Sequence, residues 1–397
     1  MGDSELPLFP FDTPAELDAE PEYAKLRRDD PVPRVRLLAG GEAYLASRYE
    51  DVRRVLSDPV FSRAATSDPG VAVLRPTRRD PYLMVSLDAP EHTRIRRLVA
   101  RAFTTRSVEQ LRPRVEQIVT DLIDAMETRP RPVDFVAAFA QPLPALVISD
   151  MVGAPPADVH MLRRWMDITL SVTAHTPEEM KAAGEEVFAY LGELIATKRA
   201  QPAEDLLTRM IQARDEEDKL SEPELLTNTY LLLTAGYETT ASLLASSLLT
   251  LEQHPDQLAA MRADPGAIPG AVEEMLRYIR IAKGVLERVA TQEVELSGVK
   301  VPAGSSVIAL HYSANRDEAL MPDPDRFDIA RQTVQHLAFG GGIHHCLGAS
   351  LARLELCVAF EGLLRRLPGL RPAVSPSQVE WKHGLLTRSP VALPVTW

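Results

Sequence analysis

The apolar positions of the chain recur mostly with the period of an α-helix. Between residues 90 and 253 they fall three and four positions apart, which predicts a largely helical region. One such face comprises Val115, Ile118, Val119, Leu122 and Ile123. Residues 33–38 and 43–48 instead read as the two strands of a hairpin, and residues 289–309 carry further strand and turn signals. The pattern predicts a mainly α fold with a small β-rich part, in the α+β class.

The longest helical segment is expected to begin at Ser221. Ser221 can cap the helix, Pro223 falls within its first turn, and Glu224 completes a capping box. No further proline occurs before Pro255, so the helix would run for roughly 30 residues, or about 45 Å at the rise of an α-helix. It is strongly apolar on both sides of its middle, which is typical of a central, buried helix.

The middle of this helix has an unusual composition for a purely structural element. Gly236 costs up to about 1 kcal/mol relative to alanine, and Glu238 is the sole charged residue within 225–251. Because burying an unpaired carboxylate is costly, Glu238 either reaches solvent or an arginine, or serves a proton path with Thr239. Gly236 would let another group approach the backbone. The Thr239 hydroxyl can also bond the carbonyl of Ala235 and bend the helix.

A glycine-rich stretch before the last major helix is the most informative segment. Three consecutive glycines at 340–342 permit unusual dihedral angles and leave room for a flat partner close to the backbone. Helical patterning begins at about Leu347, so Cys346 lies at or just before a helix N-terminus. The amide groups and the dipole at that position favour a thiolate, which is the form that ligates metals.

The residue types alone leave several chemistries possible for Cys346. It can ligate a metal, form a zinc site with His344 and His345, or act as a nucleophile beside a histidine. A free cysteine commonly packs as a small buried hydrophobic residue. This interpretation suits Cys357, which shares a helix face with Leu354 and Phe360. The glycines and the helix start favour metal-linked or nucleophilic chemistry for Cys346.

Composition excludes several classes of function. The net charge of -12 argues against general nucleic-acid binding. The 2 cysteines cannot supply a disulfide framework or the thiolates of an iron–sulfur cluster, and no dinucleotide or P-loop fingerprint occurs. Neither a signal peptide nor an uncharged apolar run of about 18 or more residues is found. We therefore expect a cytoplasmic protein without a membrane anchor.

Together these segments resemble the cytochrome P450 superfamily. Residues 339–348 match its haem-binding pattern Phe-x-x-Gly-x-x-x-Cys-x-Gly, and residues 235–239 look like its oxygen-activation segment. Glu274 and Arg277 match its Glu-x-x-Arg pair, followed by a meander at 322–327. The resemblance is to soluble bacterial, actinobacterial-type members that tailor macrolides and polyketides.

The resemblance implies one cytochrome P450 domain over residues 1–397, with a long central helix over a buried haem. Its β-rich part would span about 30–60 and 285–310, and its helical core about 90–280 and 346–367.

Roles for individual residues also follow from the resemblance. Cys346 would be the axial thiolate of haem b, Glu238 and Thr239 would deliver protons during dioxygen activation, and Glu274 with Arg277 would be structural. The implied cofactor-binding residues are His92, Arg96, Ala235, Gly236, Arg288, Phe339, Gly340, His344, Cys346 and Gly348. The expected substrate pocket is lined by Leu74, Met84, Val85, Leu232, Ala235, Ile281, Val285 and Leu286. The alternative interpretation of each pocket residue is that it packs in the ordinary hydrophobic core.

The implied reaction is insertion of one oxygen atom from O2 into a small hydrophobic substrate, by hydroxylation or epoxidation. Since the chain lacks dinucleotide and iron–sulfur motifs, electrons from NAD(P)H would arrive through a ferredoxin reductase and a ferredoxin. The expected docking helix carries Arg94, Arg96, Arg97, Arg101 and Arg106; a solvated face is the usual alternative for such a run. Three rival functions are a haem-thiolate peroxygenase or ring-coupling oxidase, a zinc or cysteine hydrolase, and a non-catalytic haem or ligand carrier.

Overall fold

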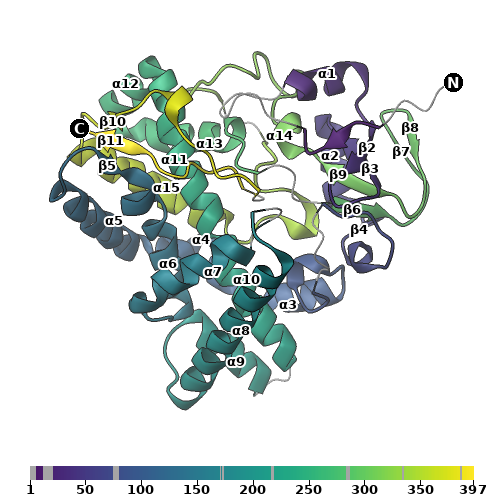
Figure 1. Ribbon diagram of the computed structural model, residues 1–397, viewed down its shortest axis with the longest axis horizontal. Coiled ribbons are helices and arrows are strands. Elements are labelled where there is room, and N and C mark those ends of the chain that lie inside the picture. The colour runs from purple at the N-terminus through teal and green to yellow at the C-terminus, as the bar shows by residue number, and fades with distance from the viewer. Residues whose placement is uncertain are drawn as a thin grey trace. The chain divides into compact units, whose positions relative to one another are not determined.

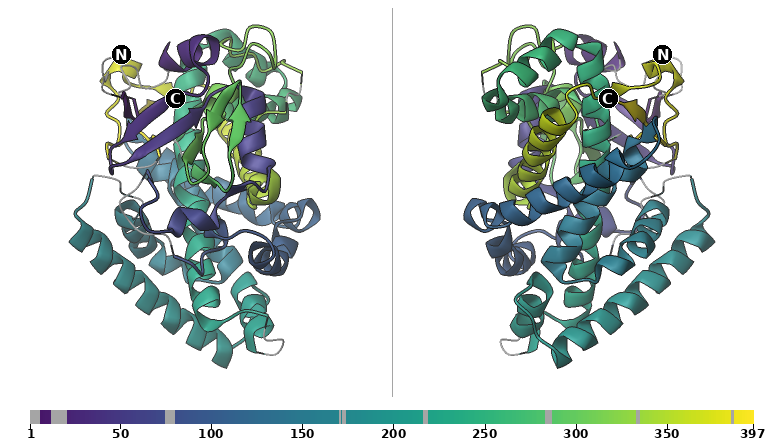
Figure 2. Two further views of the ribbon diagram at one scale, coloured as in Figure 1. Left: turned by 90° about the vertical axis from the view of Figure 1, so that its right-hand side faces the viewer. Right: turned by 90° about the vertical axis from the view of Figure 1, so that its left-hand side faces the viewer.

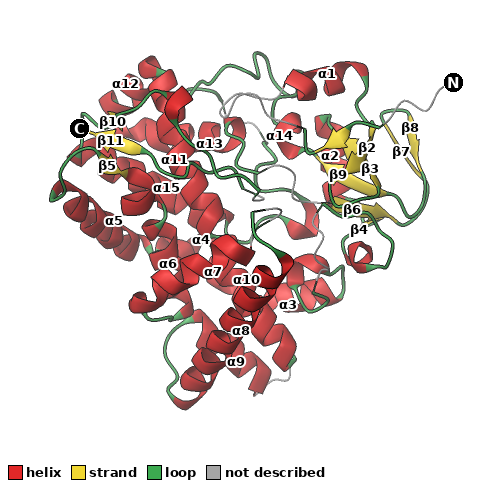
Figure 3. Cartoon of the chain, viewed as in Figure 1, coloured by secondary structure: helices red, strands yellow, loops and turns green. Residues whose placement is uncertain are grey.

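The chain is described by a computed structural model (Figure 1). The described residues are 6–11, 21–74, 80–169, 171, 174–215, 219–282, 287–332, 335–384 and 387–397. The chain divides into two compact units. The β-rich unit comprises Met1–Thr93, Leu276–Phe327 and Arg331–Cys346, and the helical unit comprises Arg94–Met275, Asp328–Ala330 and Leu347–Trp397. The mainly α fold with a small β-rich part is confirmed by this content (Figure 3).

The β-rich unit is built around a six-stranded sheet of order β1-β2-β3-β9-β6-β4. Its strands are β1 (Leu8–Phe9), β2 (Arg34–Leu37), β3 (Glu42–Ala46), β4 (Phe61–Ser62), β6 (Glu287–Ala290) and β9 (Ser306–Ala309), and a separate pair is β7 (Val294–Leu296) with β8 (Val299–Val301). The early strand β3 pairs in parallel with the late strand β9, so purple and green arrows lie side by side (Figure 2). The predicted hairpin is confirmed as the antiparallel pair β2–β3.

Among the described residues, three α-helices belong wholly to the β-rich unit. They are α1 (Pro21–Asp29), α2 (Tyr49–Ser57) and α14 (His311–Ala314). Tyr49, Val52 and Val55 of α2 join Val307 and Ala309 of the sheet in one buried apolar cluster. This burial stabilises the unit, since apolar area removed from water drives folding.

The helical unit consists mainly of helices. They are α4 (Thr105–Glu109), α5 (Arg112–Glu127), α6 (Pro142–Val152), α7 (Val159–Thr169), α8 (Pro177–Ala200), α9 (Leu206–Asp215), α10 (Glu222–Ala235), α11 (Tyr237–Gln253), α12 (Pro255–Ala263) and α15 (Ala349–Arg366). Helices α3 (Glu91–Ala100) and α13 (Ile268–Tyr278) have residues in both units. A three-stranded sheet is formed by β10 (Arg371–Pro372), β11 (Pro394–Thr396) and β5 (Val133–Asp134). Within the described ranges, no helix has both the length and the apolar character needed to cross a membrane.

The expected long helix after Ser221 is divided in two. Its start is confirmed, because Ser221 and Glu224 form a capping box with Pro223 in the first turn. The prediction of one uninterrupted helix is wrong: α10 ends at Ala235 and α11 begins at Tyr237, with Gly236 between them. The Thr239 hydroxyl donates to the Ala235 carbonyl over 3.0 Å. This bond uses the carbonyl that otherwise accepts only the backbone amide four residues later. The predicted bond is confirmed, and the bend stays a prediction.

Candidate functional site

The thiol-bearing loop of the β-rich unit is held by its own backbone. The Cys346 amide donates to the Phe339 carbonyl over 2.8 Å, and the His345 amide donates to the Gly342 carbonyl over 3.1 Å. These bonds close the loop, and Cys346 is exposed. Helix α15 begins at Ala349 with Gly348 as its N-cap. Cys346 therefore precedes the helix N-terminus, as predicted, although the helix starts two residues later than its pattern indicated.

The glycines of this loop serve backbone geometry and packing against α2. Gly340 and Gly342 have φ values of +70° and +64°, which favour glycine. A Cβ at Gly342 would lie 2.8 Å from Ser57 Cα and would also collide with the Leu56 carbonyl. The sequence interpretation assigned the glycines to close approach of a flat partner. For Gly342 the structure supplies a different reason, because the backbone of α2 itself occupies the space that a side chain would need.

Buried cationic and imidazole groups accompany the loop. The His92 and His344 rings lie 4.3 Å apart between centroids, and His92 is only 1% exposed. Arg288, on β6, is likewise 1% exposed, while Arg96 on α3 is half-buried in the helical unit. Buried donors of this kind suit carboxylates, which need charged or hydrogen-bonding partners inside a protein. The donor set fits the implied haem: an accessible thiol for iron, with histidines and an arginine for propionates.

Glu238, on α11 of the helical unit, is buried and paired with a lysine. Glu238 is 2% exposed, and the Lys382 ammonium donates to its Oε1 over 3.2 Å. Burial raises the pKa of Glu238 to about 7, and the charge of Lys382 opposes that rise. Lys382 also donates to Asp167 Oδ1 on α7 over 3.1 Å. Glu238 therefore does not reach solvent, and its direct partner is a lysine rather than an arginine, although the charge of Arg163 also acts on it.

Lys382 and Asp167 are functional candidates that the sequence did not indicate. They lie 144 and 71 positions from Glu238, with no shared motif or periodicity. Only the fold brings them beside it. A lysine in the strand-and-turn region after α15 carries no local sign that its partner is a buried glutamate.

Residues flanking Glu238 complete this part of the site. Tyr237 is fully buried and accepts a hydrogen bond from Arg163 Nε over 3.0 Å; burial raises the pKa of its phenol, so it stays neutral. Thr239 is half-buried and Ala235 is exposed. A Cβ at Gly236 would meet no atom of the described residues within 4 Å. Packing within this chain therefore does not demand glycine there, in keeping with approach by another group.

The predicted pocket residues are distributed over both units. Leu74, Met84 and Leu232 are buried, and Val85 and Ile281 are half-buried. Val285 and Leu286 lie outside the described residues. The role of this set in substrate binding stays a prediction.

The hypothesis of a zinc site in the loop finds no support. Across the described ranges, no three His, Cys, Asp or Glu side chains converge as a metal site, although His344, His345 and Cys346 are adjacent in sequence. The other cysteine, Cys357, is partly buried, and burial raises the pKa of its thiol to about 11. It therefore remains protonated at neutral pH, as expected of a structural cysteine.

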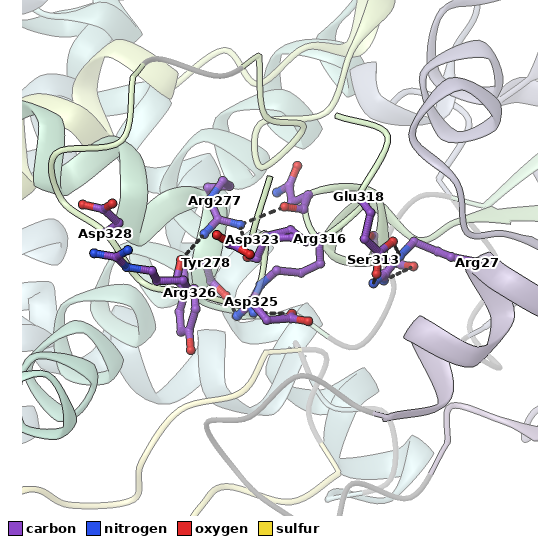
Figure 4. A network of polar contacts seen from close by, with 12 residues as sticks. Arg27, Arg277, Tyr278, Ser313, Arg316, Glu318, Asp323, Asp325, Arg326 and Asp328 are labelled. Carbon is purple, nitrogen blue, oxygen red and sulfur yellow. Dashed lines mark hydrogen bonds and ion pairs between the residues drawn. The ribbon is translucent and has the colours of Figure 1, made fainter. Parts of the chain in front are cut away.

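The predicted structural pair makes buried backbone bonds. Arg277 donates to the carbonyls of Asn315, Pro324 and Arg326 over 3.0, 2.7 and 3.2 Å (Figure 4). Glu274 accepts from the Asp328 amide over 2.9 Å. Each of the two charged side chains thus fixes backbone of the segment after α14, which agrees with a structural role.

A second arginine supports the same segment. Arg316 lies with its guanidinium 3.6 Å from the centroid of the Tyr278 ring and donates to Asp325 Oδ1 over 2.8 Å (Figure 4). Its other terminal nitrogen donates to the Tyr278 carbonyl over 2.9 Å. Sequence reasoning did not single out Arg316, because one buried arginine carries no motif of its own.

Comparison with known proteins now identifies the family. The family model described as Cytochrome P450 matches residues 147–266 and 267–392. Nocardicin C N-oxygenase of Nocardia uniformis subsp. tsuyamanensis is 48% identical over 391 residues, covering 98% of each chain. Mycinamicin IV hydroxylase/epoxidase of Micromonospora griseorubida is 44% identical over 398 residues, covering 100% of each chain.

A solved structure agrees with the sequence relatives. The crystal structure of cytochrome P450mel 107F1, described as having biaryl coupling reactivity, superposes with a TM-score of 0.94 at 40% identity, covering 98% of this chain and 99% of the other. Full-length identity, the matching fold and the thiol-bearing loop point the same way. The chain belongs to the cytochrome P450 family and is a monooxygenase of that family, an oxidoreductase.

Proposed function

We propose that this enzyme binds haem b through Cys346 and inserts one oxygen atom from O2 into a small hydrophobic substrate. Cytochromes P450 use haem and dioxygen, and haem when bound supplies the oxidising chemistry. His92, Arg96, Arg288 and His344 would hold its propionates. The observation that carries the proposal is the buried Glu238 beside the Thr239 hydroxyl, at a break in a central helix. A monooxygenase that reduces dioxygen needs such a proton supply.

Glu238 and Thr239 are suited to moving protons. A general acid works best when its pKa lies near the operating pH, and burial brings the pKa of Glu238 to about 7. The Thr239 hydroxyl donates to the Ala235 carbonyl, which fixes its orientation. Its oxygen lone pairs are then available to accept from a water or an acid.

Thr239→Ala is expected to uncouple turnover. Without the hydroxyl, more of the supplied electrons should end as hydrogen peroxide and less as product, because a correctly placed proton group is missing. The measurement is the ratio of peroxide to product at equal NAD(P)H consumption. Thr250→Ala is the matched control: the Thr250 hydroxyl makes the same bond to the carbonyl four residues earlier, over 2.9 Å, in the same helix. Equal coupling in both variants would contradict the role of Thr239.

The proposed substrate is a secondary-metabolite intermediate of macrolide or polyketide type. Support comes from the names of relatives, one a mycinamicin IV hydroxylase/epoxidase and one a nocardicin C N-oxygenase. Substrate classes of this fold are set by pocket details, so the analogy concerns the class alone. Screening macrolide, polyketide and lactam compounds for a spin-state shift of the haem Soret band would identify the substrate. A shift from none of the macrolide or polyketide compounds would count against this class.

Electrons are proposed to come from a ferredoxin that docks on three exposed arginines, Arg97, Arg101 and Arg106. The expectation that one helix carries the whole basic run is wrong, because α3 ends at Ala100 and Arg106 lies on α4. Arg94 of the same run is instead engaged with Glu224 of α10. Charge complementarity steers such encounters and weakens with salt.

Reversing two of these charges, Arg97→Glu with Arg101→Glu, should lower ferredoxin-driven turnover and its sensitivity to salt. Turnover driven by peroxide should be unchanged, because it needs no protein partner. Arg28→Glu, at an exposed arginine of α1, is the matched control. If the double variant retains normal ferredoxin turnover, the docking face lies elsewhere. Steady turnover with NADPH alone would contradict the need for a separate redox partner.

A peroxygenase or ring-coupling oxidase is the second candidate function. It is favoured by the structural neighbour described as having biaryl coupling reactivity. Comparing product formation with peroxide against product formation with a ferredoxin and its reductase separates the two candidates. Oxygen from labelled O2 should enter the product of a monooxygenase, whereas a coupled product would contain none.

A further inference from the structure

Three side chains form a short line of alternating charge in the helical unit. Glu238 of α11 is 2% exposed, Lys382 is 15% exposed and Asp167 of α7 is 40% exposed. The ammonium group lies 3.2 Å from Glu238 Oε1 and 3.1 Å from Asp167 Oδ1. The line therefore runs from a buried carboxyl, through one lysine, to a carboxylate at the surface.

The lysine is fixed by its own backbone. The Lys382 amide donates to the Ser389 carbonyl over 2.8 Å, and the preceding residue, Trp381, forms a bridge with Pro390. These two backbone contacts hold the segment that carries Lys382. Fixing a rotamer-rich lysine costs side-chain entropy, which the two carboxylate contacts offset.

The charges that act on Glu238 come from two elements packed near it. Helix α7 contributes Arg163 and Asp167, and the C-terminal segment contributes Lys382; Tyr237 beside it on α11 stays neutral. Lys382 and Arg163 favour the ionised carboxylate, whereas burial and Asp167 favour the protonated acid. The two partners of the line therefore act on Glu238 in opposite directions.

Lys382 is poorly suited to be the proton donor itself. Burial lowers the pKa of the ammonium group, but its two carboxylate partners together outweigh burial, so this pKa lies above its usual value. An ammonium group with so high a pKa would not yield a proton readily to a carboxyl group with a pKa of about 7. Its contribution must lie in placing Glu238 and in adjusting when that carboxyl is protonated.

We propose that Lys382 is the positioning residue of Glu238, that it holds the carboxyl group in place and sets its protonation, and that Asp167 on α7 opposes it. This rests on the proposed function, in which Glu238 supplies protons. Among the described residues no group bonds Glu238 Oε2. With Oε1 engaged by Lys382, Oε2 is the oxygen left to exchange a proton.

The test is an infrared titration of the haem-loaded protein without turnover. The C=O stretch of protonated Glu238 is isolated as the band lost in Glu238→Gln, and its intensity is followed against pH. In the parent protein the acid should lose its proton near pH 7. In Lys382→Met the midpoint should rise by about one to three pH units, because an opposite charge at this distance lowers a carboxyl pKa by that amount. In Asp167→Asn the midpoint should fall.

Opposite shifts in the two variants support the proposal, and a structural role alone would not produce them. Lys382→Arg should retain a midpoint near that of the parent. Lys300→Met removes a lysine that is 74% exposed and should have no effect. An unchanged midpoint in Lys382→Met, or shifts of the same sign in both variants, would overturn the proposal. If Lys382→Met does not fold, Asp167→Asn at the surface still decides, since a raised or constant midpoint contradicts it.

The titration of Glu238 and the coupling of Glu238→Gln test the role of Lys382 and the proposed function separately. If the titration shifts as expected while Glu238→Gln couples electrons to product normally, Lys382 positions Glu238 but Glu238 is not the proton source. If Glu238→Gln is uncoupled and the titration does not shift, the proposed function stands and the role of Lys382 is refuted.

Discussion

Replacing Cys346 by alanine is expected to abolish turnover and the spectrum of a thiolate-ligated haem. The reduced parent protein should give a strongly red-shifted Soret band with carbon monoxide, because an axial thiolate pushes electron density toward iron. Alanine offers no ligand atom. The Cys346 amide should keep its bond to the Phe339 carbonyl, since this bond needs no side chain, so the loop is expected to fold. Absorption spectra with carbon monoxide and single-turnover product analysis provide the measurement.

Cys357→Ala is the matched control for this experiment. It removes the other thiol of the chain, one that remains protonated because burial raises its pKa to about 11. Spectrum and turnover should be retained, with a small loss of stability from the removed packing. A colourless parent protein, or a red-shifted band that survives in Cys346→Ala, would contradict the assignment of Cys346. A band lost in Cys357→Ala alone would move the ligand to α15.

Local features of the molecule could be predicted because they depend on neighbours in sequence. The capping box at Ser221, the β2–β3 hairpin and the bond from Thr239 to Ala235 each involve residues at most ten positions apart. Turn and cap chemistry is local by nature. The position of Cys346 before a helix start also followed from the glycines and the apolar spacing after them.

Features that depend on the fold could not be predicted in the same way. The partner of Glu238 lies 144 positions away, and the reason for Gly342 is the backbone of α2, which is nearly three hundred positions earlier. The break at Gly236 was not predicted, because a single glycine inside a helical pattern can be tolerated without ending the helix. Its φ of −85° and ψ of −20° stay in the helical region.

Replacing Arg277 by leucine is expected to destabilise the fold by about 3 kcal/mol or more. The guanidinium group is buried and donates to three backbone carbonyls of the segment that follows α14, those of Asn315, Pro324 and Arg326. A buried acceptor that loses its donor costs about 1–3 kcal/mol. The total is a large part of a typical stability of about 5–15 kcal/mol. The urea midpoint, followed by circular dichroism, measures the effect.

The substitution Arg277→Lys separates the effect of the positive charge from the effect of the guanidinium geometry. A lysine keeps the positive charge but lacks the rigid fork that reaches several carbonyls at once, so its urea midpoint should fall between those of the parent and Arg277→Leu. Arg53→Met is the control, because Arg53 bonds Glu50 at an exposed site of α2 and its loss should change the midpoint little. A normal midpoint for Arg277→Leu would mean that the three carbonyls find other donors and that the segment after α14 does not depend on this side chain. A normal midpoint for Arg277→Lys with a lowered one for leucine would show that charge alone suffices there.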